Sequence, residues 1–253
     1  MTQYAMVIDL KKCVGCGACA LACKTENNTA GRHAGQSHNF ADFQHETSGK
    51  FPKTKYMTRP VLCNHCSNAP CVKACPVTPK AMYKTKDGIT MHNDERCIGC
   101  RACQEACPYS KMDVKIGETS VISFTGDEGA PHDPFFTNKT EVIPGCTSSG
   151  AELAGKTDLP PHRTKYDHPD YKDVRRSNIT EKCIFCEHRV KKGQEPYCVV
   201  SCPARARIFG DISDPNSEVA QLVKKYKGTV LKPEKGTKPN VYYIRSYSNT
   251  AKK

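Results

Sequence analysis

Sixteen of the 17 cysteines in this 253-residue chain fall into four groups with nearly the same spacing. The groups are Cys13-x2-Cys16-x2-Cys19-x3-Cys23, Cys63-x2-Cys66-x4-Cys71-x3-Cys75, Cys97-x2-Cys100-x2-Cys103-x3-Cys107 and Cys183-x2-Cys186-x11-Cys198-x3-Cys202. Four thiolates hold one cubane iron–sulfur cluster, so this pattern predicts four [4Fe–4S] clusters. Four clusters in one small protein indicate a path for electrons.

The fourth cysteine of each group indicates how the groups pair. In two-cluster ferredoxins it ligates the other cluster, and a proline follows it. Pro76, Pro108 and Pro203 follow the second, third and fourth groups, whereas Lys24 follows the first. The second and third groups are close in sequence and are expected to exchange their fourth cysteines directly. The first and fourth groups must then form the other unit, which wraps around the unit formed by the second and third groups.

Other cysteine chemistries explain the pattern less well. Zinc ribbons use C-x2-C pairs and do not need the third and fourth cysteines of each group. Disulfide scaffolds are typically short secreted chains. A thioredoxin-like C-x-x-C motif would require a βαβ pattern, which does not surround these pairs.

The formal charge of +12 is not a signal of nucleic-acid binding. In the loaded protein, sixteen ligand thiolates contribute −16 and four [4Fe–4S] cores of charge +2 contribute +8. The net charge is then about +4 instead of +12. Lysine and arginine are therefore expected to act mainly as counter-charge for anionic clusters, and positive charge near a cluster raises its potential. The apolar fraction is 38% and tryptophan is absent, so the clusters are expected to replace part of a thin core.

The elements that position the cysteines follow from local patterns. Strands are expected at 5–10 and 241–244, the latter pairing back onto the first domain, and a short helix at 18–25. Hairpins are expected at 82–91, around a Lys86-Asp87-Gly88 turn, and again at 114–124. The apolar residues of 218–227 recur at helical spacing, with Asp214 as the expected N-cap and Pro215 at the first helical position.

We expect an α+β fold with two ferredoxin-like domains, each holding two [4Fe–4S] clusters. Residues 1–58 and 179–253 form the discontinuous outer domain, and residues 59–124 form the inner one. Residues 125–178 have no period and are rich in proline and glycine, which predicts a long irregular insertion. It is either a disordered surface insertion or an arm that contacts a partner. Cys146, within it, is expected to be a spare thiol.

Two histidines lie near cysteine groups, but all thiolate positions are filled. For His65, inside the second group, and His188, after the fourth, we expect hydrogen bonding near a cluster or simple exposure to solvent. No serine–histidine–acid set, phosphate loop or carboxylate pair is present, so no catalytic residue is predicted.

The whole chain resembles the four-cluster iron–sulfur subunit of molybdopterin oxidoreductases of the dimethyl sulfoxide reductase family. The resemblance rests on Cys13-Val-Gly-Cys16-Gly-Ala-Cys19, Leu62-Cys-Asn-His-Cys66, Ala69-Pro-Cys71-Val-Lys-Ala-Cys75-Pro76, Cys97-Ile-Gly-Cys100-Arg-Ala-Cys103 and Glu181-Lys-Cys-Ile-Phe-Cys186. Within the family, residues 19–29 and the tail from Leu231 to Ser246 are most similar to the arsenate respiratory reductase small subunit. Subunits for polysulfide, thiosulfate, tetrathionate and dimethyl sulfoxide are only modestly more distant.

The resemblance implies four ligand sets, which we number from the catalytic subunit outward. They are a first set of Cys13, Cys16, Cys19 and Cys202, a second of Cys183, Cys186, Cys198 and Cys23, a third of Cys63, Cys66, Cys71 and Cys107, and a fourth of Cys97, Cys100, Cys103 and Cys75. The fourth set would face a membrane subunit or a cytochrome. Because Cys100 is present, all four clusters are expected to be cubanes.

The resemblance also implies the role of the chain, which is electron transfer without catalysis of its own. It would relay electrons between a quinol-linked donor or membrane-anchor subunit and a molybdopterin catalytic subunit in anaerobic respiration. The alternative is a subunit of a soluble molybdopterin enzyme, or of a cytosolic formate dehydrogenase or hydrogenase complex. No apolar stretch approaches the roughly 18 residues that span a bilayer, and no export signal opens the sequence. We therefore expect co-export to the periplasmic side on a twin-arginine signal of the partner, with cytoplasmic residence as the alternative.

Overall fold

Strand β1 (Tyr4–Asp9) is the centre of the largest sheet and is buried on both faces. The computed structural model describes residues 2–27, 29–126, 145, 148, 149, 152 and 177–245. In it, β8 (Arg207–Asp211) pairs antiparallel with one edge of β1, and β9 (Val241–Ile244) pairs parallel with the other. The expected first strand and the return of the last strand are both confirmed.

The two faces of β1 pack into different cores because successive side chains of a strand point to opposite sides. Ala5 and Val7 pack with Val219 of helix α8 (Glu218–Tyr226), whereas Met6 and Ile8 pack into a core that contains several of the cysteines. This explains why the sequence of β1 is a continuous apolar run and not an alternating one.

Helix α8 forms where its apolar period predicts, but its N-cap differs from the expected one. The hydroxyl of Ser217 accepts the Ala220 N–H at 3.1 Å and caps the helix. Asp214 instead accepts the N–H of Asn216 at 2.9 Å, in the turn before the helix. The expectation of Asp214 as N-cap was therefore wrong, because a second capping residue lies three positions closer to the apolar run.

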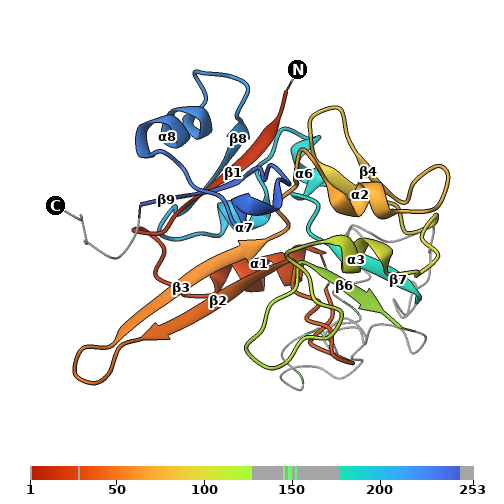
Figure 1. Ribbon diagram of the computed structural model, residues 1–253, viewed down its shortest axis with the longest axis horizontal. Helices are drawn as coiled ribbons and strands as arrows, with labels where there is room; N and C mark the ends of the chain where they lie inside the picture. The colour runs from red at the N-terminus through yellow and green to blue at the C-terminus, as the bar shows by residue number, and fades with distance from the viewer. Residues whose placement is uncertain are drawn as a thin grey trace.

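The longest strands form a hairpin that the sequence patterns did not predict. Strands β2 (Ala41–Ser48) and β3 (Lys55–Leu62) pair along their whole length and extend away from the rest of the molecule (Figure 1). Near the body, Ala41 of β2 and the last three residues of β3 are buried, and the far half of the hairpin is mostly exposed. The shorter hairpin of β4 (Met82–Lys84) and β5 (Thr90–His92) lies where it was expected.

The expected hairpin at 114–124 is wrong. Strand β6 (Ile122–Thr125) pairs instead with the distant β7 (Ile179–Lys182). The segment before β6 has other partners, because the Val114 N–H donates to the Gly35 carbonyl at 2.8 Å and the Arg32 guanidinium binds the carbonyls of residues 114, 115 and 118. The loop at 32–36 therefore takes the hydrogen bonds that a local second strand would need.

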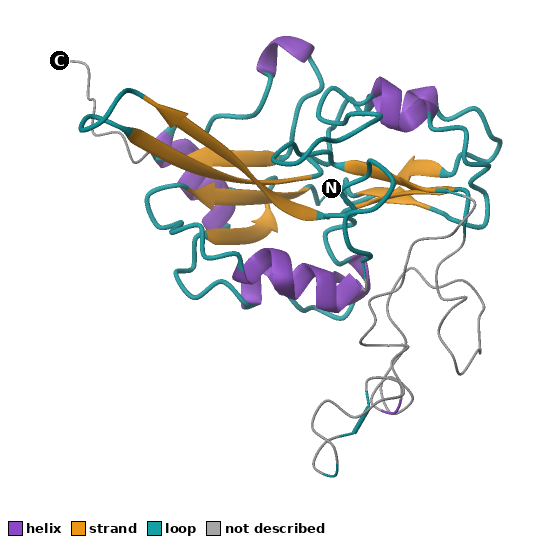
Figure 2. Ribbon diagram, turned by 90° about the horizontal axis from the view of Figure 1, so that it is seen from below, coloured by secondary structure: helices purple, strands orange, loops and turns teal. Residues whose placement is uncertain are grey.

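The remaining helices are short, and most of them contain or adjoin cysteines. They are α1 (Ala18–Asn27), α2 (Pro70–Ala74), α3 (Ala102–Ala106), α6 (Glu187–Val190), α7 (Tyr197–Val200) and the 3-10 turn η1 (Pro233–Lys235). The strands run through the middle of the molecule with helices on either side (Figure 2). In the part of the chain that the structure describes, no helix is long and apolar enough to cross a bilayer.

Most of the predicted irregular insertion, including Cys146, lies outside the described residues. Its two ends join β6 and β7, which are hydrogen-bonded neighbours. The described residues on its two sides are therefore neighbours in space.

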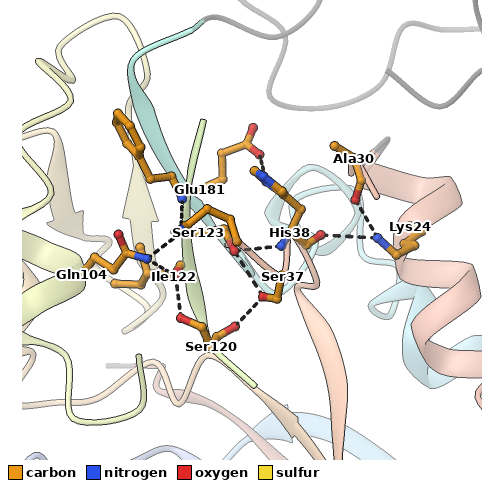
Figure 3. A network of polar contacts seen from close by, with 11 residues as sticks. Lys24, Ala30, Ser37, His38, Gln104, Ser120, Ile122, Ser123 and Glu181 are labelled. Atoms are coloured by element: carbon orange, nitrogen blue, oxygen red, sulfur yellow. Dashed lines mark hydrogen bonds and ion pairs between the residues drawn. The ribbon is translucent and has the colours of Figure 1, made fainter. Parts of the chain in front are cut away.

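A buried polar network ties the 36–38 segment to β6 and α3 (Figure 3). Gln104 is fully buried, and its amide N–H groups donate to the carbonyls of Lys111 and Ile122 and to the side chain of Gln36, at 2.8 to 3.1 Å. The hydroxyl of Ser123 accepts the His38 N–H at 2.9 Å. Because α3 begins within the third cysteine group, this network fixes the helix that carries Cys103.

We predict that Gln104→Leu destabilises the fold by about 1–3 kcal/mol, because it leaves several buried acceptors unsatisfied. The measurement is the midpoint of urea unfolding of the anaerobically prepared protein, followed by far-UV circular dichroism. The matched control is Glu105→Leu, at an exposed position of the same helix, which should leave the midpoint nearly unchanged. Equal midpoints for the two variants would contradict the structural role of the network.

Candidate metal centres

One hollow of about 360 Å³ is lined by Cys13, Cys16, Cys19 and Cys202. Cys13 and Cys16 lie on the loop between β1 and α1, Cys19 lies in the first turn of α1, and Cys202 follows α7 from the far end of the sequence. Gly15 has a φ of +70°, and a Cβ there would approach the side chain of Thr58 to 3.1 Å. The loop therefore needs glycine both for its backbone conformation and for its fit against β3.

A second hollow of about 280 Å³ is lined by Cys75, Cys97, Cys100 and Cys103. It again combines the first three cysteines of one group, the last of them in the first turn of α3, with the fourth cysteine of another group. Gly99, in the loop before this helix, has a φ of +69°, and a Cβ would approach the Asn178 carbonyl oxygen to 2.5 Å. Both hollows thus bring together cysteines that are far apart in the sequence.

The other eight cysteines are all buried, and several of them influence one another electrostatically. Burial, and then the charges of Cys183, Cys198 and Cys186, raises the pKa of Cys23. Burial, and to a smaller extent Cys63, raises the pKa of Cys66 to about 12. Cys107 adds to the raised pKa of Cys66 and also to that of Cys71, in both cases after burial and Cys63.

Cysteines of different sets also approach one another, and they do so in a consistent order. In three cases burial is the main cause of a raised thiol pKa, and one cysteine of a neighbouring set raises that pKa further. The pairs are Cys19 beside Cys198, Cys63 beside Cys183, and Cys103 beside Cys71. These electrostatic influences link cysteines of the first and second, the second and third, and the third and fourth sets.

The two ends of this path are the parts open to solvent. Cys16 and Cys100 are exposed, and each lies in a loop with an exposed apolar neighbour. The exposed fractions are 73% for Val14 and 64% for Ile98. An apolar side chain beside an accessible metal-binding loop is suited to contact with another protein.

Hydrogen-bond donors point at several of the sulfur atoms, as thiolate ligands require. Backbone N–H groups of Ala206, Phe185 and Met82 donate to the Sγ atoms of Cys202, Cys183 and Cys75 at 3.2, 3.4 and 3.5 Å. The amide of Asn27 donates to Cys23 Sγ at 3.4 Å, and the Thr180 hydroxyl lies 3.3 Å from Cys103 Sγ. The first, second and fourth sets therefore each have at least one such donor.

The thiols fit a positively charged cofactor because they are difficult to ionise without one. Burial, and then neighbouring cysteines, raises the pKa of Cys103 to about 11 and that of Cys186 to about 12. Such thiols remain protonated at neutral pH unless a cation stabilises the thiolate. The iron ions of a cluster supply that charge, and their binding releases the protons. No three His, Cys, Asp or Glu side chains of the described ranges are grouped as ligands of a single metal ion.

Of the two expected roles of His65, hydrogen bonding near a cluster or exposure to solvent, the second is wrong because the residue is fully buried. Its ring stacks on Phe185 with 3.6 Å between the ring centres, and its Nδ1 accepts the Thr90 N–H at 3.1 Å. The stack joins the Cys63–Cys66 loop to the Cys183–Cys186 loop. His188 has a different role, since its Nε2 lies 2.7 Å from a carboxylate oxygen of Glu26.

Two buried cations were not singled out from the sequence. Arg207 is 2% exposed and lines the first hollow, and Lys182 is 1% exposed. The ammonium group of Lys182 donates to the carbonyls of Thr90 and Cys183. The only sequence signal was the expectation that basic residues serve as counter-charge, which did not say which of them would be internal.

Known families match the regions that contain these cysteines. The 4Fe-4S dicluster domain matches residues 54–122 and 164–212, and the 4Fe-4S binding domain matches residues 4–25. The residues matched by these two families contain all four cysteine groups. They agree with the expected cofactor and not with zinc or disulfides.

Similar proteins extend the match over nearly the whole chain. The arsenate respiratory reductase iron–sulfur subunit of Shewanella sp. (strain ANA-3) is 47% identical, over 97% of each chain. A putative iron–sulfur subunit of dimethyl sulfoxide reductase from Halobacterium salinarum is 38% identical, over 96% of this chain and 79% of the relative. A selenate reductase subunit from Mesobacillus selenatarsenatis is 36% identical, over 96% and 72%. The chain therefore belongs to the four-cluster iron–sulfur subunits of the dimethyl sulfoxide reductase family of molybdopterin oxidoreductases.

Proposed function

We propose that the chain relays electrons through four [4Fe–4S] clusters held by the four ligand sets named above, in the order first, second, third and fourth. The observation that carries this is the pair of end hollows, each lined by the four cysteines of one set. Each cluster, when bound, passes one electron at a time. The electrostatic influences between cysteines of neighbouring sets support the linear order.

The two open ends are the proposed points of contact with other subunits. The end with Cys16 and Val14 faces the molybdopterin catalytic subunit, and the end with Cys100 and Ile98 faces a membrane-anchor subunit or a cytochrome. Exposure of one cysteine and one apolar residue at each end supports this assignment. The buried middle sets keep water away from the electron path and isolate it from other redox partners.

We propose arsenate as the terminal substrate of the complex, because the relative that shares 47% identity over 97% of the chain is an arsenate respiratory reductase subunit. Relatives named for tetrathionate and selenate are 33% and 36% identical. This chain contacts no substrate in the proposed complex, so its own residues do not determine that choice.

The proposed domain division is an outer unit of residues 1–58 and 179–253 and an inner unit of residues 59–124. The 125–178 insertion is proposed as an arm that contacts a partner. The hydrophobic clusters support two centres, since one contains Cys19, Cys23, Cys183 and Cys198 and another contains Cys66, Cys75, Cys103 and Cys107. Cys63 belongs to the former cluster, so the two units share an interior boundary and not a solvent-filled gap.

We predict about sixteen irons and sixteen acid-labile sulfides per chain, because each of four sets holds one cubane. The measurement is colorimetric iron and sulfide analysis of anaerobically purified and reconstituted protein. Cys146→Ser is the matched control and should retain the full content, because Cys146 belongs to no set. Fewer than about twelve irons in the unmodified protein would contradict the four-cluster assignment.

We predict that Cys202→Ala and Cys16→Ala remove or convert the same cluster, although the two residues lie at opposite ends of the sequence. The reason is that both line the first hollow. Electron paramagnetic resonance of the reduced protein should show the same signal missing in both variants. Cys100→Ala, at the other end, should affect a different signal. Loss of different signals in Cys202→Ala and Cys16→Ala would show that the pairing of the first and fourth groups is wrong.

We predict that the complex lies on the periplasmic side and that this chain is exported with its partner. A protein that must acquire clusters folds before export, which requires a route for folded proteins such as the twin-arginine pathway. Cell fractionation should find the chain in the periplasm when the partner is co-expressed. It should remain in the cytoplasm without the partner, or when the arginine pair of the partner is replaced. Cytoplasmic residence under all three conditions would favour the cytosolic alternative.

A further inference from the structure

Arg207 begins β8 at a position that is paired with Ile8 of β1, in the interior of the fold. Its side chain is 2% exposed. Nη1 donates to the Sδ of Met6 at 3.6 Å and lies 3.9 Å from the Sγ of Cys198. The same guanidinium lines the first hollow, beside Cys19.

The side chain therefore lies between two ligand sets. It lines the hollow formed by Cys13, Cys16, Cys19 and Cys202, which are the first set. Its Nη1 also reaches the Sγ of Cys198, which belongs to the second set, at 3.9 Å. One cation thus lies beside thiols of both sets.

Within the described part of the chain, the positive charge of Arg207 has no carboxylate partner. None of the ion pairs found among the described residues includes it. Its Nε and Nη2 atoms are buried and have no hydrogen-bond partner among these residues. A guanidinium cannot lose its charge in a protein, so a buried one requires an anion or an array of acceptors nearby. Thiolates and cluster sulfides on its two sides would meet that requirement.

A fixed cation affects the two redox states of a cluster unequally. The reduced cluster carries one more negative charge than the oxidised one, so the attraction to a nearby cation is stronger after reduction. The effect is large in a buried, weakly screened environment and small at an exposed position. A cation placed between two clusters therefore favours the reduced state of both.

We propose that Arg207 is a shared counter-cation of the first and second clusters, which raises the midpoint potentials of both relative to the third and fourth. This inference rests on the proposed ligand sets. If so, the two clusters at the end of the path beside the catalytic subunit attract electrons partly because of Arg207, and not only because of their cysteine ligands.

The test is a redox titration of the anaerobic holoprotein, followed cluster by cluster with electron paramagnetic resonance. In Arg207→Gln, the equilibrium constant for reducing the first and second clusters should fall at least about tenfold, which is 59 mV for a one-electron couple. The third and fourth clusters should keep their potentials. In Arg207→Lys, which retains the charge, the first two clusters should shift by less than half as much.

The matched control is Arg205→Gln, which removes the same charge two residues away at an exposed position. It should leave all four potentials unchanged, because solvent screens an exposed charge. Equal shifts in Arg205→Gln and Arg207→Gln would overturn the proposal, as would wild-type potentials in a fully loaded Arg207→Gln protein or a common shift of all four clusters.

Loss of iron in Arg207→Gln is also informative. If Arg207→Lys keeps its iron while Arg207→Gln loses the first and second clusters, the charge is required and the proposal is supported. If both variants lose the same clusters, the shape of arginine is required and the proposal fails. The proposed function fails separately, if the unmodified protein contains fewer than four clusters.

Discussion

Everything in this structure depends on placing thiols where their charged form is unfavourable without metal. Twelve of the sixteen described cysteines are buried, and burial is the largest influence on most of their pKa values. Thiolates in such positions repel one another and are poorly solvated. Iron reverses both penalties, because it supplies positive charge at the centre of each set. The fold is therefore completed by the clusters and does not merely enclose them.

The polypeptide between the cysteines is organised around this constraint. Helices that contain cysteines are short, and the fold brings Cys202 and Cys75 to hollows lined by three cysteines from another part of the chain. The apolar cores are formed partly by the cysteines themselves, which replace the larger aromatic residues of an ordinary interior. Cross-linking of distant segments by clusters compensates for a thin apolar core in the same way that structural zinc does in small domains.

Several positively charged side chains are also buried near the cysteines. Arg207 and Lys182 are fully internal, which is rare for these residue types unless anions accompany them. Lys84 is half-buried, and its ammonium group binds the carbonyls of residues 65, 66 and 88, next to the third set. Buried cations next to anionic clusters would offset part of the negative charge of the interior. They also offer a means of adjusting each cluster separately, since each cation is close to some sets and distant from others.

Local patterns in the sequence were sufficient for the cofactor and for several elements. Spacing of the cysteines predicted cubane clusters, because ligand spacing is a local geometric requirement of the cluster loop. Strand β1, the hairpin of β4 and β5, and helix α8 were also predictable, since each has a clear apolar period or a glycine turn. Resemblance to a family supplied the electron-transfer role, which the similar proteins confirm.

Tertiary structure decided the features that depend on distant partners. Strands β2 and β3 were missed because their sequences, ADFQHETS and KYMTRPVL, are polar or contain a proline and are stabilised mainly by pairing with each other. The pairing of β6 with β7 joins segments more than fifty residues apart, which no local pattern encodes. Arg207 resembles any surface arginine in the sequence, and only the folded chain places it between two thiol sets. The sequence by itself determined the kind of cofactor, because the cysteine spacing that a cluster loop needs is local. Only the tertiary structure decided the burial and the electrostatic surroundings of the cysteines, because both depend on residues from the whole fold.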